Sequence, residues 1–283
     1  ELRQTLDRFG IRYTPYYLVN GIEVQGGPLL RLYLSTRPEV DRVLDSPRLR
    51  PLPEPIQVSP GSERTIAESP GWNIKMIGAD KVWNEFGVTG QGIVVGQSDS
   101  GVEGSHPALA DAYRGRAEGD DYNWFDPWDS TRSPNDEGGH GTHTLGTILG
   151  SRGIGVAPGA QWMGCVNLNR NLGNPPLYLD CMQFMLAPFP HGGDPFKDGD
   201  PARAAHVLNN SWGCPPIEGC DANALKPAAN ALRAAGIFVV VSTGNDGPNC
   251  STVASPLSLY DSVFSVGAVD LNGSIADFRS RGP

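Results

Sequence analysis

Three polar side chains in glycine-rich surroundings, at strand ends or adjoining turns, are of types that can do chemistry. Asp99 directly follows an apolar run, His140 lies between two glycines, and Asn245 follows Gly244. A carboxylate directly after a strand is well placed to act, and glycines on both sides leave the imidazole accessible. A side-chain amide can donate a hydrogen bond to a developing oxyanion, a contact typically worth ~2.7 to 4 kcal/mol in the transition state. These three residues are therefore the candidate catalytic residues.

Two of these residues also have an alternative explanation. Asp99 precedes Ser100-Gly101 and could serve as a turn residue or a helix cap. His140 and His143 could share one face of a helix and bind a metal ion. However, no third His, Cys or carboxylate stands at an obvious ligand spacing, and the His-Glu-x-x-His signature is absent. We therefore expect no metal at this site.

An alternation of strand-like and helix-like segments surrounds the candidate residues. Strand patterns occupy residues 92–98, 161–168, 206–209, 237–242 and 263–269, and helical patterns occupy 141–149, 177–186 and 222–235. Such alternation predicts an α/β fold with a doubly wound parallel sheet. Functional residues in this architecture lie just beyond the carboxyl ends of the strands. Asp99, at the end of the first strand, meets this condition.

The first 57 residues have a different pattern and predict a small separate unit. An amphipathic helix over 2–9 ends at Gly10, and a second helical stripe runs over 28–44. Two extended runs flank Asn20-Gly21, which taken alone suggests a two-residue hairpin turn. Prolines at 51, 53, 55, 60 and 70 then indicate a linker. We therefore divide the chain into 1–57, a linker at 58–71 and a main domain at 72–283.

Composition excludes several classes of function. The 283 residues are 39% hydrophobic and 19% charged, which is ordinary for a packed globular protein. A net charge of −9 and a pI near 5.0 disfavour nucleic acid and anionic membrane surfaces as partners. No stretch approaches the ~18 to 20 apolar residues that a membrane-spanning helix needs. We expect a chain that binds neither nucleic acid nor a membrane.

Taken together, the motifs of the main domain resemble those of the subtilisin-like serine peptidases, the subtilase family. The matching segments are Asp99-Ser100-Gly101, residues 140–143, residues 155–160, Asn210-Ser211-Trp212-Gly213, Gly244-Asn245 and residues 265–269. The resemblance covers about 72–283. Residues 122–127 and 209–213 further resemble the bacillopeptidase-like branch of that family.

The resemblance implies a role for each matching residue in cutting a peptide or protein substrate. His140 would be the general base, Asp99 would orient it, and Asn245 would donate to the oxyanion. Ser211, Trp212 and Gly213 would lie alongside an extended substrate and form one wall of the S1 pocket. Leu172 and Gly173 would supply the opposite edge strand. Trp212 beside that pocket hints at apolar or basic substrate residues.

The nucleophile of the family follows the asparagine in a Gly-Thr-Ser context, and this sequence has no such segment. The serines after Asn245 are at 251, 255, 258, 262, 265, 274 and 280, none in that context. We expect the domain to be truncated before the serine, which a missing C-terminal segment would supply. Removing a triad nucleophile typically costs on the order of 10⁶ in turnover, so this chain alone should be inactive. The alternative is a non-catalytic, peptidase-like binding or regulatory scaffold.

The resemblance also implies a role for the N-terminal unit. Residues 1–57 resemble the α+β inhibitory propeptide that precedes subtilase domains, which would act as an intramolecular partner and make the chain a proenzyme. Asn20-Gly21 would then lie along or beside a strand, and the hairpin would be wrong. Glu1 would fall partway into the propeptide, and processing would occur between Leu52 and Thr65. An unrelated small helical adaptor is the alternative.

The five cysteines have no CxxC spacing, so we expect no zinc site. The resemblance implies a secreted or extracytoplasmic enzyme, and that location favours disulfides. Cys165 with Cys181 and Cys214 with Cys220 are plausible pairs; Cys250 then remains odd or displaces one member of the second pair. Reduced, buried cysteines are the alternative.

We expect no required cofactor, although many subtilases bind structural calcium. The position of the family's calcium-binding Asp is Ala108 in this sequence, which puts that site in doubt. An acidic stretch over 115–137 could bind a cation elsewhere or form a solvated loop. Its acidic members are Glu118, Asp120, Asp121, Asp126, Asp129, Asp136 and Glu137.

Overall fold

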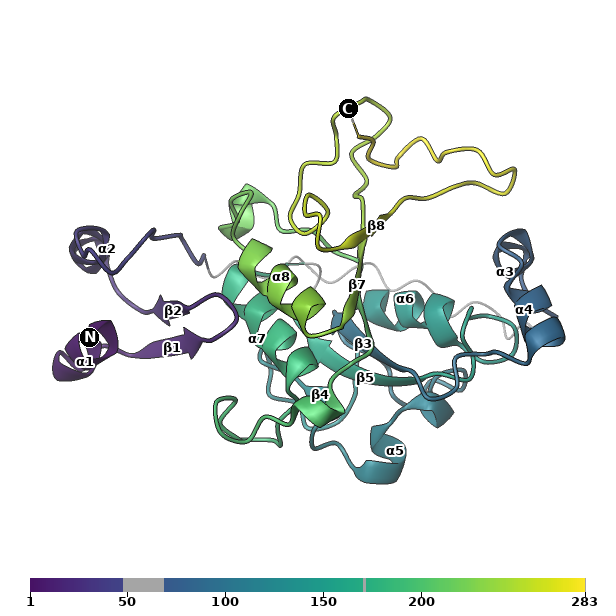
Figure 1. Cartoon of the computed structure of the whole chain (residues 1–283), viewed down its shortest axis with the longest axis horizontal. Helices are drawn as coiled ribbons and strands as arrows, with labels where there is room; N and C mark the ends of the chain where they lie inside the picture. Colours follow the sequence, from purple (N-terminus) through teal and green to yellow (C-terminus); the bar gives the residue numbers. More distant parts are fainter. Residues whose placement is uncertain (48–68, 170–171, 283) are drawn as a thin grey trace.

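Six parallel strands form the sheet at the centre of the molecule (Figure 1). Their spatial order is β4 (Trp124–Phe125), β5 (Gln161–Val166), β3 (Val94–Asp99), β6 (Val207–Asn210), β7 (Phe238–Ser242) and β8 (Phe264–Val266). The chain passes from β3 outward to β5 and then returns to the other side of β3 to form β6. This reversal beside β3 confirms the doubly wound α/β fold. Only the short β4 was not expected from the sequence.

Helices cover both faces of the sheet because neighbouring strand residues point to opposite sides. On one face, Val95 joins an apolar cluster with α6 (His140–Leu149). On the other face, Val94 joins a cluster with α7 (Pro175–Leu186) and α8 (Lys226–Ala234). The three expected long helices therefore form, and the strand between them is buried along its whole length.

Shorter helices lie around this core. They are α3 (Trp72–Met76), α4 (Ala79–Phe86), α5 (Gly115–Glu118) and the 3₁₀ turns η1 (Ala110–Ala112), η2 (Pro201–Arg203) and η3 (Pro216–Glu218). Gly78 and Gly87, with φ of 71° and 65°, bound α4 at its two ends. Since left-handed backbone is what glycine tolerates best, these two residues decide where α4 starts and stops.

The structure is a computed structural model that describes residues 1–47, 69–169 and 172–282. The expected processing site between Leu52 and Thr65 and most of the expected linker lie outside the described residues. Within the described ranges, no helix combines the length and the apolar character needed to cross a bilayer.

The N-terminal unit consists of α1 (Leu2–Arg8), β1 (Tyr13–Tyr16), β2 (Gly21–Val24) and α2 (Pro28–Ser35). The two strands form an antiparallel hairpin with Tyr16 opposite Gly21, so the loop holds the four residues 17–20 rather than two. The hairpin expectation is confirmed and the two-residue turn is wrong. Asn20-Gly21 does lie beside a strand, since Gly21 begins β2, but the expectation that this would exclude a hairpin is wrong. Asn20 has φ of 48° and closes the loop as its last residue.

This hairpin is the part of the N-terminal unit that reaches α7 (Figure 1). The backbone N–H of Tyr17 donates to Gln183 Oε1 at 2.7 Å, and the Tyr17 hydroxyl donates to the Gln183 carbonyl at 3.2 Å. Tyr16 and Leu18 are buried in the same apolar cluster as α7. The hairpin loop therefore docks the unit onto the main domain.

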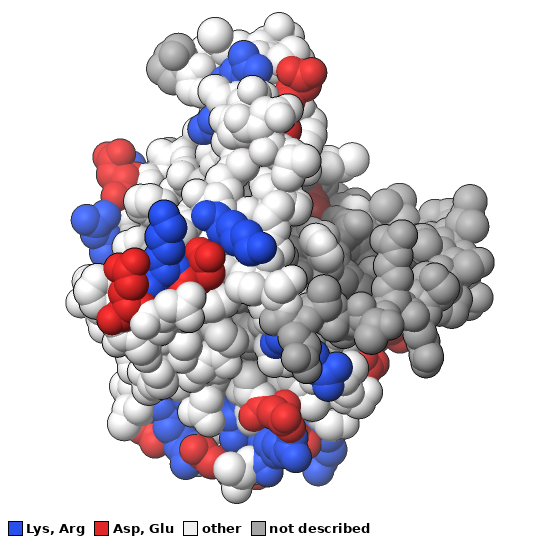
Figure 2. Space-filling view, turned by 90° about the vertical axis from the view of Figure 1, so that its right-hand side faces the viewer, with Lys and Arg blue, Asp and Glu red and all other residues white. Residues whose placement is uncertain are grey.

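Charged side chains are mixed in sign over the face shown in Figure 2, with wide uncharged areas between them. Binding to a phosphate backbone requires clustered Lys and Arg side chains. The described part of this face presents no such continuous basic surface.

Candidate active site

Asp99 and His140 meet at the carboxyl edge of the sheet. Asp99 is the last residue of β3 and is fully buried, while His140 is the first residue of α6 and keeps 39% of its side chain exposed. His140 Nδ1 lies 2.7 Å from Asp99 Oδ1. The Ser100 backbone N–H donates to the same carboxylate oxygen at 2.7 Å. The structure therefore brings together the pair predicted from the sequence, and the imidazole is the member that faces solvent.

The electrostatics of this pair favour an imidazole that accepts a proton. The hydrogen bond to Asp99 raises the pKa of His140, with further raising by the charges of Asp99 and Asp136, while burial lowers it. Because Nδ1 is engaged by Asp99, proton exchange with a nucleophile or leaving group falls to Nε2. This is the arrangement of a general base with its orienting carboxylate.

Asp136 organises the turn that delivers His140, and the sequence reading missed this role. One carboxylate oxygen accepts from the N–H groups of Gly138 and Gly139 at 3.0 and 2.8 Å and from Ser100 Oγ at 2.9 Å. The other accepts from the Thr142 N–H and hydroxyl at 2.9 and 2.6 Å. An acceptor here satisfies N–H groups that the first turn of a helix leaves free. The signal in the sequence is that Asp136 lies four positions before His140. By sequence alone, Asp136 is only one member of the acidic stretch over 115–137.

Gly141 lets α6 approach β3 closely enough for the Asp99 and His140 pair to form. A side chain at this position would collide with the carbonyl oxygen of Gly101 and would come within 3.0 Å of Asp99 Cβ. Gln97, in the strand itself, donates to the Gly141 carbonyl at 3.1 Å and to Thr144 Oγ1 at 2.7 Å. The close contact between helix and strand is therefore held by hydrogen bonds from β3.

Asn245 lies in the loop after β7, where its side chain is exposed. Gly244 precedes it with φ of 99°, and its carbonyl accepts from the Ser280 N–H at 2.9 Å. Ser280 Oγ in turn accepts from the Asp246 N–H at 3.0 Å. The loop around Asn245 is thus held on both sides, and no described residue hydrogen-bonds its amide. The role of Asn245 as the oxyanion donor therefore stays a prediction.

The segment after β6 differs from the expected substrate wall in one respect. Trp212 is 7% exposed, its ring stacks on Tyr178 with centroids 4.0 Å apart, and its Nε1 donates to the Ser98 carbonyl at 2.9 Å. The indole is therefore largely buried against Tyr178, and its influence on S1 preference stays a prediction. Ser211 Oγ instead accepts from Asn209 Nδ2 at 3.0 Å, next to the sheet.

Leu172 and Gly173 do not form a strand. Leu172 makes an isolated antiparallel bridge with Asn169, and the buried Gly173 donates its N–H to Glu218 Oε1 at 3.1 Å. Since that N–H is already engaged, the Gly173 amide cannot pair with a substrate backbone. The expectation of an edge strand at these two residues is corrected accordingly.

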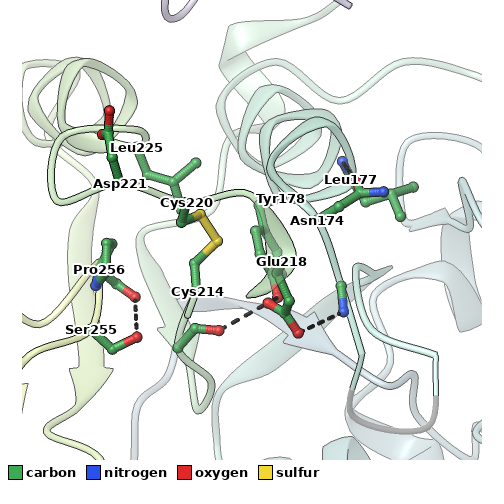
Figure 3. Close-up of a disulfide and its surroundings, with 12 residues drawn as sticks. Asn174, Leu177, Tyr178, Cys214, Glu218, Cys220, Asp221, Leu225, Ser255 and Pro256 are labelled. Atoms are coloured by element: carbon green, nitrogen blue, oxygen red, sulfur yellow. Dashed lines mark hydrogen bonds between the residues drawn. A yellow bond between two sulfur atoms is a disulfide. The ribbon is translucent and has the colours of Figure 1, made fainter. Parts of the chain in front are cut away.

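Two disulfides form, between Cys165 and Cys181 and between Cys214 and Cys220, each with Cα atoms 5.6 Å apart. That spacing is ordinary for a disulfide. The first joins β5 to α7, and the second closes a six-residue separation directly after Gly213 (Figure 3). Both are the pairs anticipated from the sequence, and Cys250 is exposed and unpaired.

The residues present do not fit the family's usual calcium site. Ala108 is buried and has no side-chain oxygen to offer a cation. Asp126 already accepts from the N–H groups of Trp128, Asp129 and Thr131, so its carboxylate organises its own loop. No group of three or more His, Cys, Asp or Glu side chains suited to a metal ion occurs among the residues that the structure describes.

Comparison with known proteins agrees with this geometry. Residues 90–283 match the profile of the subtilase family. Bacillopeptidase F of Bacillus subtilis (strain 168) is 35% identical over 95% of this chain and 19% of its own length. Subtilisin DY of Bacillus licheniformis is 32% identical over 76% of this chain and 70% of its own length.

Serine protease AprX of Bacillus subtilis (strain 168) is 28% identical, over 69% of this chain and 44% of its own length. The chain thus spans about a fifth of bacillopeptidase F and less than half of AprX. The match to the family profile covers more than half of the chain, and the similarity to bacillopeptidase F covers nearly all of it. This chain is a member of the subtilase family, in its bacillopeptidase-like branch.

Proposed function

We propose that this chain supplies the aspartate and the histidine of the catalytic triad of a serine endopeptidase that acts on peptides or proteins. The observation that carries the proposal is the 2.7 Å contact between His140 Nδ1 and the buried Asp99 carboxylate at the carboxyl edge of the sheet. His140 takes the proton of a serine hydroxyl through Nε2 and returns it to the leaving amine, while Asp99 stabilises the imidazolium. Asn245 donates to the oxyanion.

The nucleophile, in this proposal, comes from a segment of the whole protein outside residues 1–283. The region around β8 supports this, because its apolar side chains are exposed. Phe264 and Phe278 are 57% and 56% exposed, and Val266 and Ile275 are 45% and 49% exposed. Exposed large apolar side chains concentrated in one short stretch of chain favour a surface that another element covers. A segment carrying the serine would cover it and place the hydroxyl near His140.

The experiment that tests the proposal measures peptide hydrolysis by the full-length protein together with labelling by a fluorophosphonate that reacts with activated serines. We expect hydrolysis of an unstructured protein such as casein and one labelled serine outside residues 1–283. A full-length protein that binds peptides, cuts none and takes no label would instead be the non-catalytic scaffold. Strong labelling within residues 1–283 would contradict the proposed source of the nucleophile.

We also propose that the N-terminal unit is an inhibitory propeptide of a secreted proenzyme. Its contacts with the main domain support this, since they lie next to the segment after β6. Arg42 Nη1 donates to Asp221 Oδ1 and Oδ2 at 3.0 and 2.8 Å, and its Nη2 donates to the Asn223 carbonyl at 3.1 Å. The backbone of Asp45 passes directly against Gly219. Residues 42–45 of the N-terminal unit are thus held against the loop that follows Gly213.

A substitution at Gly219 tests whether this contact holds the N-terminal unit in place. Gly219 has φ of 91°, and a side chain there would collide with the Asp45 carbonyl oxygen. We expect Gly219→Ala to speed amide hydrogen exchange in residues 42–47 by about tenfold or more, as loss of one to two kcal/mol of docking would do. Gly236→Ala is the matched control, because Gly236 has φ of 90° and nothing within 4 Å of the added carbon. Equal exchange in the two variants would show that the Asp45 contact does not hold the unit.

A further inference from the structure

We infer that Glu218 is a positioning residue that fixes the segment expected to lie alongside a substrate, residues 211–213, relative to the neighbouring residues 172–173. The inference rests on the proposed peptidase function, since it concerns how an extended peptide is held in that site. Glu218 belongs to neither segment and carries no role in the triad. It hydrogen-bonds to Gly173 directly and reaches residues 211–213 through Tyr178.

The contacts of Glu218 show how it joins the two segments (Figure 3). Its side chain is buried, with the residue only 4% exposed. One carboxylate oxygen accepts from the Gly173 N–H at 3.1 Å, and the other accepts from the Tyr178 hydroxyl at 2.5 Å. Burial raises the pKa of Glu218, whereas these two hydrogen bonds lower it. A buried carboxylate is costly unless it is hydrogen-bonded, so the two donors keep it in this place.

Tyr178 carries the connection to the other segment. Its hydroxyl lies 3.5 Å from the Gly213 carbonyl oxygen, and its ring stacks on Trp212 with an angle of 8° between the ring planes. Tyr178 belongs to α7, which packs against the sheet, so its ring has little freedom to move. A shift of Glu218 therefore displaces the Gly173 amide directly and the Trp212-Gly213 backbone through Tyr178.

The disulfide explains how a short loop can hold a carboxylate inside the protein. Cys214 and Cys220 close the loop that contains η3, and Glu218 is the last residue of η3. Gly219 follows with left-handed backbone and turns the chain back toward Cys220. Cross-linking a loop removes conformations from the unfolded chain and restricts local opening. The Cys214–Cys220 loop thus presents Glu218 to Gly173 and Tyr178 with little freedom.

A residue that fixes this segment affects long peptides more than short ones. A peptide long enough to run along residues 211–213 depends on the position of that segment, whereas the bond-breaking chemistry depends on Asp99 and His140. We therefore expect Glu218→Gln in the full-length protein to raise KM for an eight-residue peptide about tenfold, as loss of one buried charge-assisted hydrogen bond would do. The kcat for that peptide, and both constants for a two-residue substrate, stay within about twofold of wild type.

Glu118→Gln is the surface control, because Glu118, on α5, bonds among the described residues to Arg203 of η2 alone, at the surface. It should leave KM for both peptides unchanged. A Glu218→Gln protein with the wild-type KM for the long peptide, in an active wild-type background, would overturn the inference while leaving the proposed function standing.

A double-mutant cycle with Tyr178→Phe separates positioning from general loss of stability. Glutamine has one acceptor oxygen and turns its NH₂ group toward the second donor, so it cannot serve Gly173 and Tyr178 together. With Phe at 178 only Gly173 needs an acceptor. We therefore expect Glu218→Gln to raise KM less in the Tyr178→Phe background than in the wild type, and additive effects would overturn the connection through Tyr178.

Hydrogen exchange gives a readout that does not need activity. Glu218→Gln should speed exchange by about tenfold in peptides covering residues 172–178 and 211–214, with no change around His140. If the full-length wild-type protein hydrolyses no peptide, the proposed function fails, and this exchange measurement still decides whether Glu218 holds the two segments. Unchanged exchange in both peptides overturns the inference.

Discussion

Asp99→Asn in the full-length protein is expected to lower kcat for peptide hydrolysis by about four orders of magnitude, because an amide selects the wrong tautomer of the catalytic imidazole. Asp99 Oδ1 lies 2.7 Å from His140 Nδ1, and this hydrogen bond is the largest cause of the raised pKa of His140. The variant should therefore also move the acid limb of the kcat/KM profile to lower pH, since the His140 pKa falls when the bond is lost. Steady-state hydrolysis measured at about ten pH values between roughly pH 5 and 9 checks both effects.

A second Asp–His contact in the same molecule supplies the matched control. Asp121 Oδ1 lies 2.9 Å from His191 Nδ1, on the surface and outside the candidate site. Asp121→Asn should leave kcat and its pH dependence unchanged. If Asp99→Asn retained about a tenth or more of the wild-type kcat, the assignment of Asp99 as the orienting carboxylate would be wrong.

Gly141→Ala is expected to reduce both stability and activity, although the change adds a single carbon. The added carbon would collide with the Gly101 carbonyl oxygen and crowd Asp99 Cβ, so α6 must move away from β3. Overpacking of this kind typically costs ~1 to 3 kcal/mol in the free energy of unfolding. A displacement of about 1 Å between catalytic groups can cost on the order of 10² in rate, and we expect a loss of kcat of that size.

Gly146→Ala, in the same helix, tests the reason for this effect. Nothing lies within 4 Å of the carbon that this change adds. Because alanine favours a helix over glycine by up to ~1 kcal/mol, the control should increase the free energy of unfolding and leave kcat unchanged. Chemical denaturation and peptide hydrolysis measured on both proteins decide the matter. Equal losses of stability and kcat in the two variants would show that the effect of Gly141→Ala does not come from the contact with Gly101.

The order of strands and helices in the main domain could be predicted from local patterns. The buried run that begins near residue 92 became β3, and the stretch expected over 177–186 became α7, which starts two residues earlier at Pro175. These elements are determined by apolar periodicity and by glycine and proline at their ends, and both are local properties of the chain. The same holds for Asp99 and His140, since strand ends of a doubly wound sheet gather at one edge.

The residues that hold the site in place could not be predicted in this way. Asp136 accepts from donors up to 36 positions away, and Glu218 accepts from Gly173 and Tyr178, 45 and 40 positions away. No short motif connects such residues, because each bond depends on where other elements pack. The burial of Trp212 is a similar case, since the stacking partner Tyr178 lies on another element.

By itself, the sequence determined the class of the fold, the order of its elements, and the identity of the Asp99 and His140 pair. Those features follow from patterns of a few neighbouring residues. Only the tertiary structure decided the four-residue loop of the β1–β2 hairpin, the engaged amide of Gly173, and the hydrogen bonds of Glu218 to Gly173 and Tyr178. The physical reason is that these features depend on hydrogen bonds and packing between groups far apart in the chain, whose partners are chosen when the elements assemble.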